Sequence, residues 1–190
     1  MSSIDPTRLG FRPVTPDDFS LLEGWLKTPH WQEWWGKAWE TELGHISDMV
    51  EGKDSTRPFL ILLDGRVVGY IQSWIIADAL CEPWLTEAPW LREVPTHSVG
   101  VDLSIGDAAD LCKGIGSAAL KAFVDLLLAE GHDCILIDPD AANGRAVRAY
   151  EKAGFRPLLV SPEPGSDGAQ ATLIMKFAAT DAVPNDRTSA

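Results

Sequence analysis

Two stretches of the chain decide its fold: residues 102–116 (DLSIGDAADLCKGIG) and residues 138–155 (DPDAANGRAVRAYEKAGF). The first reads as the end of a strand, a loop closing on Lys113-Gly114-Ile115-Gly116, and the start of a long helix. Glycine lets a backbone approach a ligand closely, and the free N–H groups of a helix's first turn favour an anion such as pyrophosphate. Taken alone, this pattern is better explained as a tight turn, because it is neither a Walker A loop nor a complete dinucleotide-binding fingerprint.

Outward from these stretches, apolar periodicity and turn residues predict alternating strands and helices. Asp64-Gly65 between two apolar runs is a strong hairpin signal, and Thr15 followed by Pro16 is a favourable helix start. The order of elements predicts an α/β (α+β) protein in which helices pack on a mixed sheet. We expect strands over residues 11–14, 58–63, 66–76, 97–105, 135–137, 155–160 and 171–177, and helices beginning after Thr15 and over residues 30–36, 41–50, 116–130 and 143–153.

The length and composition indicate one domain. The chain has 190 residues, 45% of them hydrophobic, which suffices for one well-filled core. We expect a single domain over residues 9–178, with residues 1–8 and 179–190 as flexible ends because they lack an apolar pattern. No apolar stretch reaches membrane-spanning length, and Cys81, Cys112 and Cys134 have no disulfide-framework spacing, so we expect a cytoplasmic protein.

The charge of the chain excludes some partners and favours another. Asp and Glu number 28 against 16 Lys and Arg, a net charge of −12, which would repel a nucleic acid or an anionic membrane. Residues 78–110 carry seven acids against Arg92 alone, half of the net charge. An acidic lip walled by tryptophan would attract a cationic small molecule, although such acids also serve solubility. No metal site is expected, since these carboxylates have no ligand spacing with histidine.

Taken together, the two stretches resemble the GNAT superfamily of acyl-CoA-dependent N-acetyltransferases. The likeness spans residues 9–177 in element order, and its most specific part is Asn143 followed by Tyr150-Glu151-Lys152-Ala153-Gly154-Phe155. Leu111 stands where the superfamily usually has Gln or Arg, which removes one side chain near the phosphates and leaves the backbone cradle. The resemblance implies a mixed sheet of about seven strands flanked by about four helices, and direct acetyl transfer from acetyl-CoA to a primary amine.

A narrower resemblance points to one branch of the superfamily. The segments 30–36 (HWQEWWG), 69–73 (GYIQS) and 100–102 (GVD), with the glycine loop, are similar to aminoglycoside 6′-N-acetyltransferases. Siderophore-pathway acyltransferases, which act on hydroxylated lysine-type amines, share the tryptophan-rich segment but are expected to have histidine where Asp102 stands. The resemblance therefore favours a cationic, aminoglycoside-like acceptor. A non-catalytic acyl-CoA-binding module is a third interpretation, and the chain is expected to be a monomer or a homodimer.

The resemblance assigns catalytic roles to Tyr150 and Asp102. Tyr150 matches the tyrosine that protonates the CoA thiolate, and a phenol with a pKa of about 10 is close to an alkyl thiol in acidity. Its competing role is an apolar helix contact. Asp102 could hold the substrate ammonium and accept its proton, although an aspartate pKa near 3.9 makes it a weak base unless burial raises that value. Its competing role is a solvated aspartate at a strand end.

Further residues are expected to bind the two substrates. Asp138 could face the acceptor or cap the next turn, and Asn143 could touch the pantetheine arm or cap its helix. Trp34 and Trp35 point about 100° apart on a helix, so Trp31, Trp34, Trp35 and Trp39 cannot all face one stripe, and at least one of the four should be exposed at a cleft or an interface. The expected acceptor-binding residues are Trp34, Trp35, Gln72, Glu82, Asp102 and Asp138, and the expected acetyl-CoA-binding residues are Leu103, Ser104, Ile105, Lys113, Gly114, Ile115, Gly116, Ser117, Asn143, Ala146 and Arg148.

Overall fold

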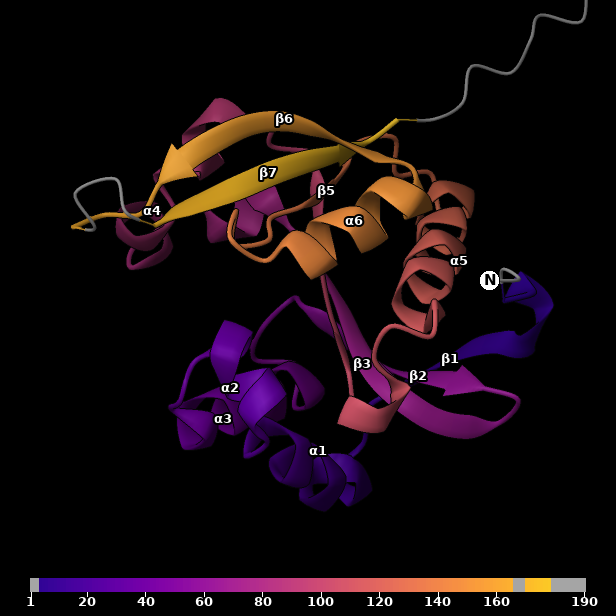
Figure 1. Cartoon of the computed structure of the whole chain (residues 1–190). Helices are drawn as coiled ribbons and strands as arrows, with labels where there is room; N and C mark the ends of the chain where they lie inside the picture. The colour runs from indigo at the N-terminus through magenta and orange to yellow at the C-terminus, as the bar shows by residue number, and fades with distance from the viewer. Residues whose placement is uncertain (1–3, 166–169, 179–190) are drawn as a thin grey trace, which may run out of the picture.

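The computed structural model describes residues 4–165 and 170–178, which form a seven-stranded mixed sheet (Figure 1). The strand order is β1-β2-β3-β4-β5-β7-β6, and every neighbouring pair is antiparallel except β4 and β5. This confirms the predicted α/β class and strand number. The strands are β1 (Leu9–Pro13), β2 (Arg57–Leu63), β3 (Arg66–Ile75), β4 (Val99–Ile105), β5 (Ile135–Ile137), β6 (Phe155–Pro162) and β7 (Ala171–Phe177).

The parallel pair is short, and this opens the sheet at its centre. Strands β4 and β5 pair only at Val99 with Ile135 and at Gly100 with Leu136. Beyond Gly100, β4 continues to Ile105 beside β3 alone. Figure 1 shows the two parts of the sheet diverging from this point, with β6, β7 and α6 (Gly144–Ala153) on one side and β1–β3 on the other. The end of β4 is therefore left free to line a cleft.

Six α-helices occur in the described residues, where the residue pattern predicted five and the family resemblance implied about four. The extra helices include α4, one short turn within the long connection between β3 and β4. The helices are α1 (Phe19–Leu26), α2 (Pro29–Trp35), α3 (Trp39–Val50), α4 (Trp84–Glu87), α5 (Ile115–Ala129) and α6 (Gly144–Ala153).

The helices cover the two faces of the sheet, and strand alternation explains how both faces become buried. On β2, Ile61 packs into the core under α5, whereas its neighbour Leu60 packs with α1, α2 and α3 on the other face. On β3, Ile71 and Tyr70 divide in the same way. The tryptophan-rich segment thus forms a second apolar cluster around Trp31 instead of extending the main core.

Local sequence signals place the turns and helix ends. Asp64 and Gly65 both have positive φ, 52° and 79°, as the predicted two-residue hairpin turn requires. Asn143 Oδ1 accepts from the Ala146 N–H at 3.1 Å, so Asn143 caps α6, and Gly154 at φ 107° ends it. The cap and the terminal glycine together fix the length of the helix that carries Tyr150.

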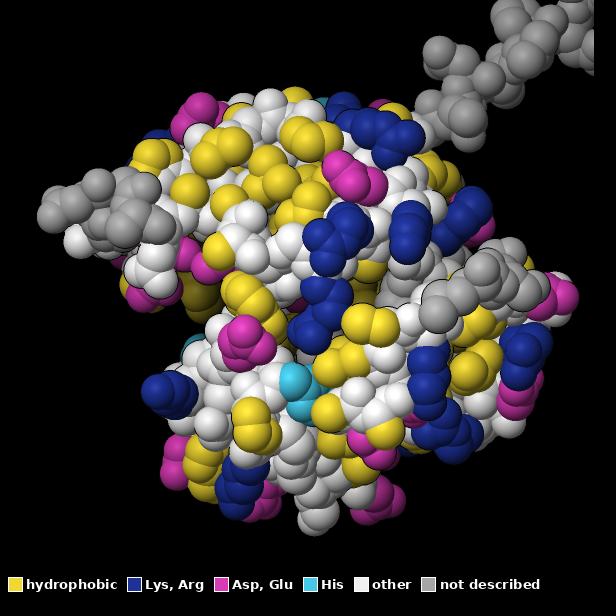
Figure 2. Space-filling view, viewed as in Figure 1, with side chains coloured by type: hydrophobic (Ala, Val, Ile, Leu, Met, Phe, Trp, Pro, Cys, Tyr) yellow, Lys and Arg dark blue, Asp and Glu magenta, His cyan; other side chains and the backbone are white. Residues whose placement is uncertain are grey.

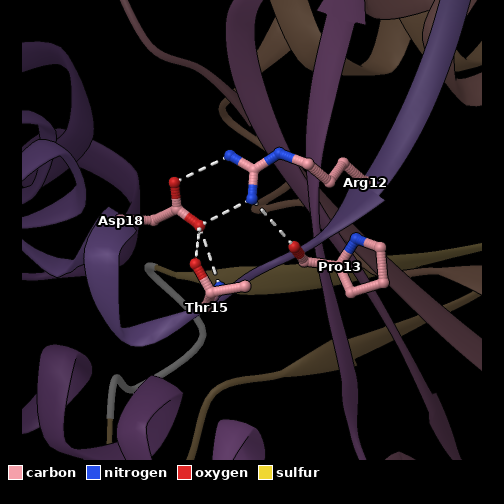
Figure 3. Close-up of polar contacts among 4 residues, drawn as sticks. All are labelled: Arg12, Pro13, Thr15 and Asp18. Atoms are coloured by element: carbon pink, nitrogen blue, oxygen red, sulfur yellow. Dashed lines mark hydrogen bonds and ion pairs between the residues drawn. The ribbon is translucent and has the colours of Figure 1, made fainter.

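The start of the first helical segment is tied to β1 by an ion pair (Figure 3). Arg12 donates to both carboxylate oxygens of Asp18, at 2.7 and 2.9 Å, while the Thr15 N–H and hydroxyl donate to Oδ2 of the same aspartate. These donors lower the pKa of Asp18 to about 2, the Arg12 guanidinium contributing most. The predicted cap at Thr15 is therefore present as a reciprocal capping box.

The two chain ends were expected to be flexible. At the N-terminal end, Pro6–Arg8 forms a 3₁₀ turn, Ile4 packs against the main core, and Arg8 forms an ion pair with Asp64. Residues 179–190 lie outside the described part of the chain. Within the described part, no helix is long and apolar enough to cross a membrane, and no group of three His, Cys, Asp or Glu side chains could hold a metal ion.

Candidate active site

A cleft of about 490 Å³ lies where β4 and β5 diverge. It is bounded by α2 and β3 on what we call the acceptor side, and by residues 111–117 and α6 on what we call the cofactor side. Figure 2 shows the molecule hollowed between its upper and lower halves, with basic side chains gathered beside the hollow. Asp102 and Tyr150 both line this cleft, although 48 positions separate them in the sequence.

Asp102 is held by two neutral donors from β3. Gln72 Nε2 and Trp74 Nε1 each donate to Oδ2 of Asp102 at 2.9 Å. Gln72 lies directly opposite Asp102 in the antiparallel register, and Trp74 lies opposite Gly100. Removal of the carboxylate from bulk water raises the pKa of Asp102, although both donors favour its charged form.

Gly100 allows Trp74 to reach this position. A Cβ atom on Gly100 would lie 2.3–2.8 Å from three atoms of the Trp74 indole, so no other residue fits beneath the ring. Trp74 also contacts the ring of Trp90, at 6.3 Å between centroids. Sequence reasoning missed Trp74. The glycine two residues before Asp102, opposite a tryptophan, was the available signal.

The amide of Gln72 is oriented by Tyr70. The Tyr70 hydroxyl donates to Gln72 Oε1 at 2.5 Å, which leaves Gln72 Nε2 to donate to Asp102. Tyr70 is fully buried, and its ring contacts those of Trp31 and Trp35. The aromatic cluster on the acceptor side therefore supports the polar groups around Asp102 from behind.

The end of β4 is anchored by α2. His30 Nε2 lies 3.1 Å from the carbonyl oxygen of Ile105, and Trp31 Nε1 donates to the same oxygen at 2.9 Å. Trp34 and Trp35, on the same helix, line the cleft as predicted. The Trp34 indole N–H is buried without a hydrogen-bond partner among residues 4–165 and 170–178.

Asp138 and Tyr150 complete the group around Asp102. Asp138 lines the cleft, and the following turn is capped instead by Asp140, whose Oδ1 accepts from the Ala142 N–H at 2.7 Å. Burial and the charge of Asp102 raise the pKa of Asp138 well above its usual range. Burial, Asp102 and Asp138 also raise the pKa of Tyr150. These three groups therefore interact electrostatically in the cleft, so the protonation of one depends on the others.

The cofactor side is built mainly from backbone. Gly114, the N-cap residue of α5, adopts φ 83° and has no side chain with which to cap the helix start. Such a start offers free N–H groups to an anion. The predicted acetyl-CoA-binding residues that line the cleft are Leu103, Ser104, Ile105, Gly114, Ile115, Gly116, Ser117, Asn143, Ala146 and Arg148, and they are joined there by Arg145 and Lys152 of α6.

Lys113 is the exception among the predicted acetyl-CoA-binding residues. It does not line the cleft, and its ammonium donates to Oδ1 of Asp110, which does, at 2.9 Å. Arg66 donates to the other oxygen of Asp110 at 3.0 Å, and the two cations lower the pKa of that carboxyl. Lys113 is thus ion-paired with Asp110, and its expected contribution of positive charge at the phosphates stays a prediction. The cations that line the cleft come from α6 instead.

A second cavity, of about 680 Å³, adjoins the acceptor side. It shares Trp35 and Gln72 with the main cleft, and its other lining residues include Glu42, Trp84 and Glu87. Glu42 is half-buried, and its pKa is raised by burial and by the charge of Asp102, while His45 opposes that shift. Sequence reasoning missed Glu42, although Glu42 and His45 fall on one face of a predicted helix.

Glu82, which was expected to bind the acceptor, lines neither of these two cavities, and that role stays a prediction. Its carboxylate accepts a hydrogen bond from the Thr86 hydroxyl at 2.7 Å. Other acids of residues 78–110 are also used locally, since Asp78 accepts from Ser55 and Asp107 caps a turn at Ala109. The local charge concentration thus overstates how many of these acids face a ligand.

Comparison with known proteins decides the family. The acetyltransferase (GNAT) domain family matches residues 15–159. The chain belongs to the GNAT acetyltransferase family. It is 32% identical over 152 residues to an aminoglycoside N(6′)-acetyltransferase type 1 of Klebsiella pneumoniae, covering 76% of this chain and 72% of that protein. It is also 40% identical over 67 residues to a kanamycin resistance protein of Rhizobium radiobacter, covering 35% of this chain and 62% of that protein.

Solved structures agree with this assignment. The aminoglycoside acetyltransferase AAC(6′)-Ib in complex with paromomycin and acetyl-CoA superimposes with a TM-score of 0.75 at 30% identity, covering 96% of this GNAT chain and 99% of that one. The same enzyme in complex with coenzyme A and kanamycin gives 0.74 at 28% identity, covering 90% and 94%. The predicted family, the GNAT fold and the activity of an acetyl-CoA-dependent N-acetyltransferase are confirmed.

Proposed function

We propose that this GNAT enzyme transfers the acetyl group of acetyl-CoA to a primary amine of a polycationic, aminoglycoside-like molecule. The observation that carries the proposal is the group formed by Asp102, Asp138 and Tyr150 at the point where β4 and β5 diverge. Two interacting carboxylates in one cleft favour a cationic guest, because an ammonium relieves their mutual repulsion. The aminoglycoside-acetylating relatives support the same class of acceptor.

The acceptor nitrogen must lose a proton before it can attack. Asp102 and Asp138 hold the ammonium, and Asp102 accepts its proton, leaving the N–H electron pair on nitrogen. The raised pKa of Asp102 makes it a stronger base than an ordinary aspartate, so burial favours this step. Nitrogen then attacks the thioester carbonyl carbon and forms the new C–N bond.

The leaving thiolate must take up a proton, and Tyr150 supplies it. The C–S bond breaks with its electron pair on sulfur, and the Tyr150 hydroxyl proton moves to that sulfur. The acylated nitrogen then loses its second proton, which returns to the Tyr150 phenolate, so the products are the neutral amide and the free thiol. In the ligand-free enzyme, Asp102 and Asp138 help to raise the pKa of Tyr150 and so oppose proton release. A bound ammonium neutralises this negative charge and lowers that pKa towards that of the thiol. Acceptor binding thereby prepares the acid for its step.

The cofactor side suits an acyl-CoA. The uncapped start of α5 offers N–H groups to the pyrophosphate, and Arg145, Arg148 and Lys152 add positive charge along the cleft. The second cavity suits a further ammonium of the same acceptor, because Glu42 and Glu87 carry negative charge and Trp84 offers a ring face. An acceptor with several spaced amines can fill both cavities through the shared wall at Trp35 and Gln72.

A thiol-release assay with acetyl-CoA tests the proposal. Kanamycin, spermidine and a hydroxylated lysine are offered separately, and the acetylated product is identified by mass spectrometry. We expect turnover with kanamycin to exceed that with the other two. Turnover with the hydroxylated lysine alone would establish the siderophore-precursor alternative. Acetyl-CoA binding without turnover on any amine would contradict the acceptor class. A cytoplasmic location, a monomeric or homodimeric state, and the exclusion of nucleic acid and membrane partners stay predictions.

A further inference from the structure

We infer that Trp74 and Tyr70 are positioning residues for acetyl transfer: together they reserve Oδ2 of Asp102 as a hydrogen-bond acceptor and leave Oδ1 to take the proton of the substrate amine. This inference rests on the proposed function, because it concerns the proton of the same amine. Neither residue was expected from the sequence to act in the site.

The two oxygens of Asp102 have different partners. Oδ2 accepts two hydrogen bonds, from Gln72 Nε2 and Trp74 Nε1, each at 2.9 Å. An indole N–H can only donate, and so can an amide NH₂ group. In the described part of the chain, no group donates to Oδ1 of Asp102. A carboxyl O–H at Oδ2 would point towards donors, whereas a proton at Oδ1 keeps both hydrogen bonds, so Oδ1 is the basic oxygen.

Tyr70 makes this arrangement unambiguous. A glutamine amide can be turned through 180°, which exchanges its donor and acceptor ends. If the Gln72 amide turned, Oε1 would face Oδ2 of Asp102, acceptor against acceptor. The Tyr70 hydroxyl donates to Oε1 at 2.5 Å and holds the productive orientation. Tyr70 thus acts on Asp102 through Gln72.

Packing fixes both positioning residues. The Trp74 indole lies over Gly100 and against Trp90, and Tyr70 is fully buried against the rings of Trp31 and Trp35. Tyr70→Phe therefore removes a hydroxyl and leaves the ring held by the same neighbours. Trp74→Phe removes the N–H but also replaces the indole by a smaller ring, so a tryptophan packed against it and not bonded to Asp102 is needed to separate the hydrogen bond from the packing.

The proton balance is simple. The N–H bond of the ammonium breaks, its electron pair stays on nitrogen, and a new O–H bond forms at Oδ1 of Asp102. The titratable and charged groups that interact with Asp102 or with its neighbours are Glu42 and His45 on α3, Asp54 before β2, Tyr70 on β3, Asp138 after β5, and Tyr150 and Arg145 on α6. None of them changes when the Trp74 indole N–H is removed. A shift in the pH profile then reports the missing donor.

The test is the pH profile of kcat/KM for kanamycin in Trp74→Phe. Both donors favour charged Asp102, so losing one raises its pKa, and the acidic limb of the profile should move up by about one pH unit. Trp90→Phe is the matched control, because Trp90 contacts the Trp74 ring and is not a donor to Asp102. It should leave the limb in place. A uniform loss of activity at every pH in Trp74→Phe would overturn the inference, since that is the signature of packing alone.

Tyr70 is tested by a double-mutant cycle with Gln72. Tyr70→Phe should move the acidic limb of the pH profile to higher pH, by a smaller amount than Trp74→Phe does. In a Gln72→Leu background, Tyr70→Phe should cause no additional shift, because Tyr70 acts through the Gln72 amide. Equal shifts in both backgrounds would overturn the role of Tyr70. If the wild-type enzyme releases no thiol with kanamycin, the proposed function fails and the inference with it. Wild-type turnover with an unmoved limb in Trp74→Phe refutes the inference alone.

Discussion

The acceptor side and the cofactor side of the cleft are built by different means. On the acceptor side, β3 and β4 supply side chains that hydrogen-bond to one another, from Tyr70 and Gln72 on β3 to Asp102 on β4, and aromatic rings support them. On the cofactor side, the start of α5 and the cap of α6 present backbone, and the basic residues of α6 add charge. One side depends on exact side-chain identity, and the other on backbone shape.

This difference has a chemical reason. The phosphates and amides of an acyl-CoA can be bound by N–H groups that any sequence supplies, provided the chain turns correctly. An ammonium that must also lose its proton needs a carboxylate of defined pKa, and only surrounding side chains set that pKa. We therefore expect substitutions on the acceptor side to alter rate and pH dependence, and those on the cofactor side to alter acetyl-CoA affinity.

Tyr150 tests the limit of this comparison, because it stands on the cofactor side and performs chemistry. Tyr150→Phe should lower kcat by about 10²–10³-fold, since the thiolate loses its proton donor. Acetyl-CoA affinity, measured by calorimetry, should stay within about twofold, because the phenol ring and the α6 packing are retained. An unchanged kcat would show that Tyr150 is a helix contact and that another group protonates the thiolate.

Gly114 tests the backbone side directly. Its φ of 83° strains any residue with a Cβ, at a cost of about 1–2 kcal/mol. Gly114→Ala should therefore raise the KM for acetyl-CoA by about tenfold and leave the pH profile unmoved. Gly24→Ala is the matched control, because Gly24 lies in α1 with an ordinary φ and open space around its Cα. Alanine favours a helix interior, so Gly24→Ala should leave the KM for acetyl-CoA unchanged. An equal rise of KM in both variants would mean that the positive φ of Gly114 is not what acetyl-CoA binding requires.

The sequence predicts the backbone-built side better than the other. Glycine, the Asn143 cap and helix ends are local signals, so the loop before α5 and the limits of α6 follow from neighbouring residues. The contacts of Asp102 with Gln72 and Trp74 depend on the register between β3 and β4, which no short window of sequence reveals. The contacts of Asp110 with both Lys113 and Arg66 similarly depend on a loop meeting a distant hairpin. Long-range pairing is what the sequence leaves open.

Glu42 tests whether the acceptor side contains residues that bind the acceptor without taking part in the chemical step. It lines the second cavity, away from Tyr150, so Glu42→Gln should raise the KM for kanamycin by about three- to fivefold with little change in kcat. The effect should shrink at high salt, since the charge is only half-buried. Glu40→Gln, an exposed position on the same helix, is the control and should change neither constant. A lower kcat in Glu42→Gln would instead place Glu42 with the groups that set the pKa of Asp102.

The smallest expected effect is that of substituting Asp18, and it is an effect on folding stability. The Asp18 carboxylate joins the first helical segment to β1, in the same half of the molecule as the acceptor side of the cleft. Its pKa is lowered to about 2 from an unfolded value of 3.8. A carboxyl whose pKa is lowered in the folded state stabilises the fold at pH values above its pKa in the unfolded state. This contribution is lost as the pH falls from about 4 to about 2. Because Arg12 is 41% exposed, we expect about 1–2 kcal/mol, less than the full shift would give.

Asp18→Asn should therefore be less stable than wild type by that amount at pH 6 in urea unfolding, and the gap should close as the pH approaches 2. Asp17→Asn, an exposed neighbour, is the control and should track wild type at every pH. If the gap at pH 6 persists at pH 2, the contribution of Asp18 is not electrostatic, and the capping geometry at Thr15 carries it instead. A stability difference that does not change with pH would also mean that backbone geometry, and not charge, stabilises this point near the acceptor side. The contrast between the acceptor side and the backbone-built cofactor side would then be weaker.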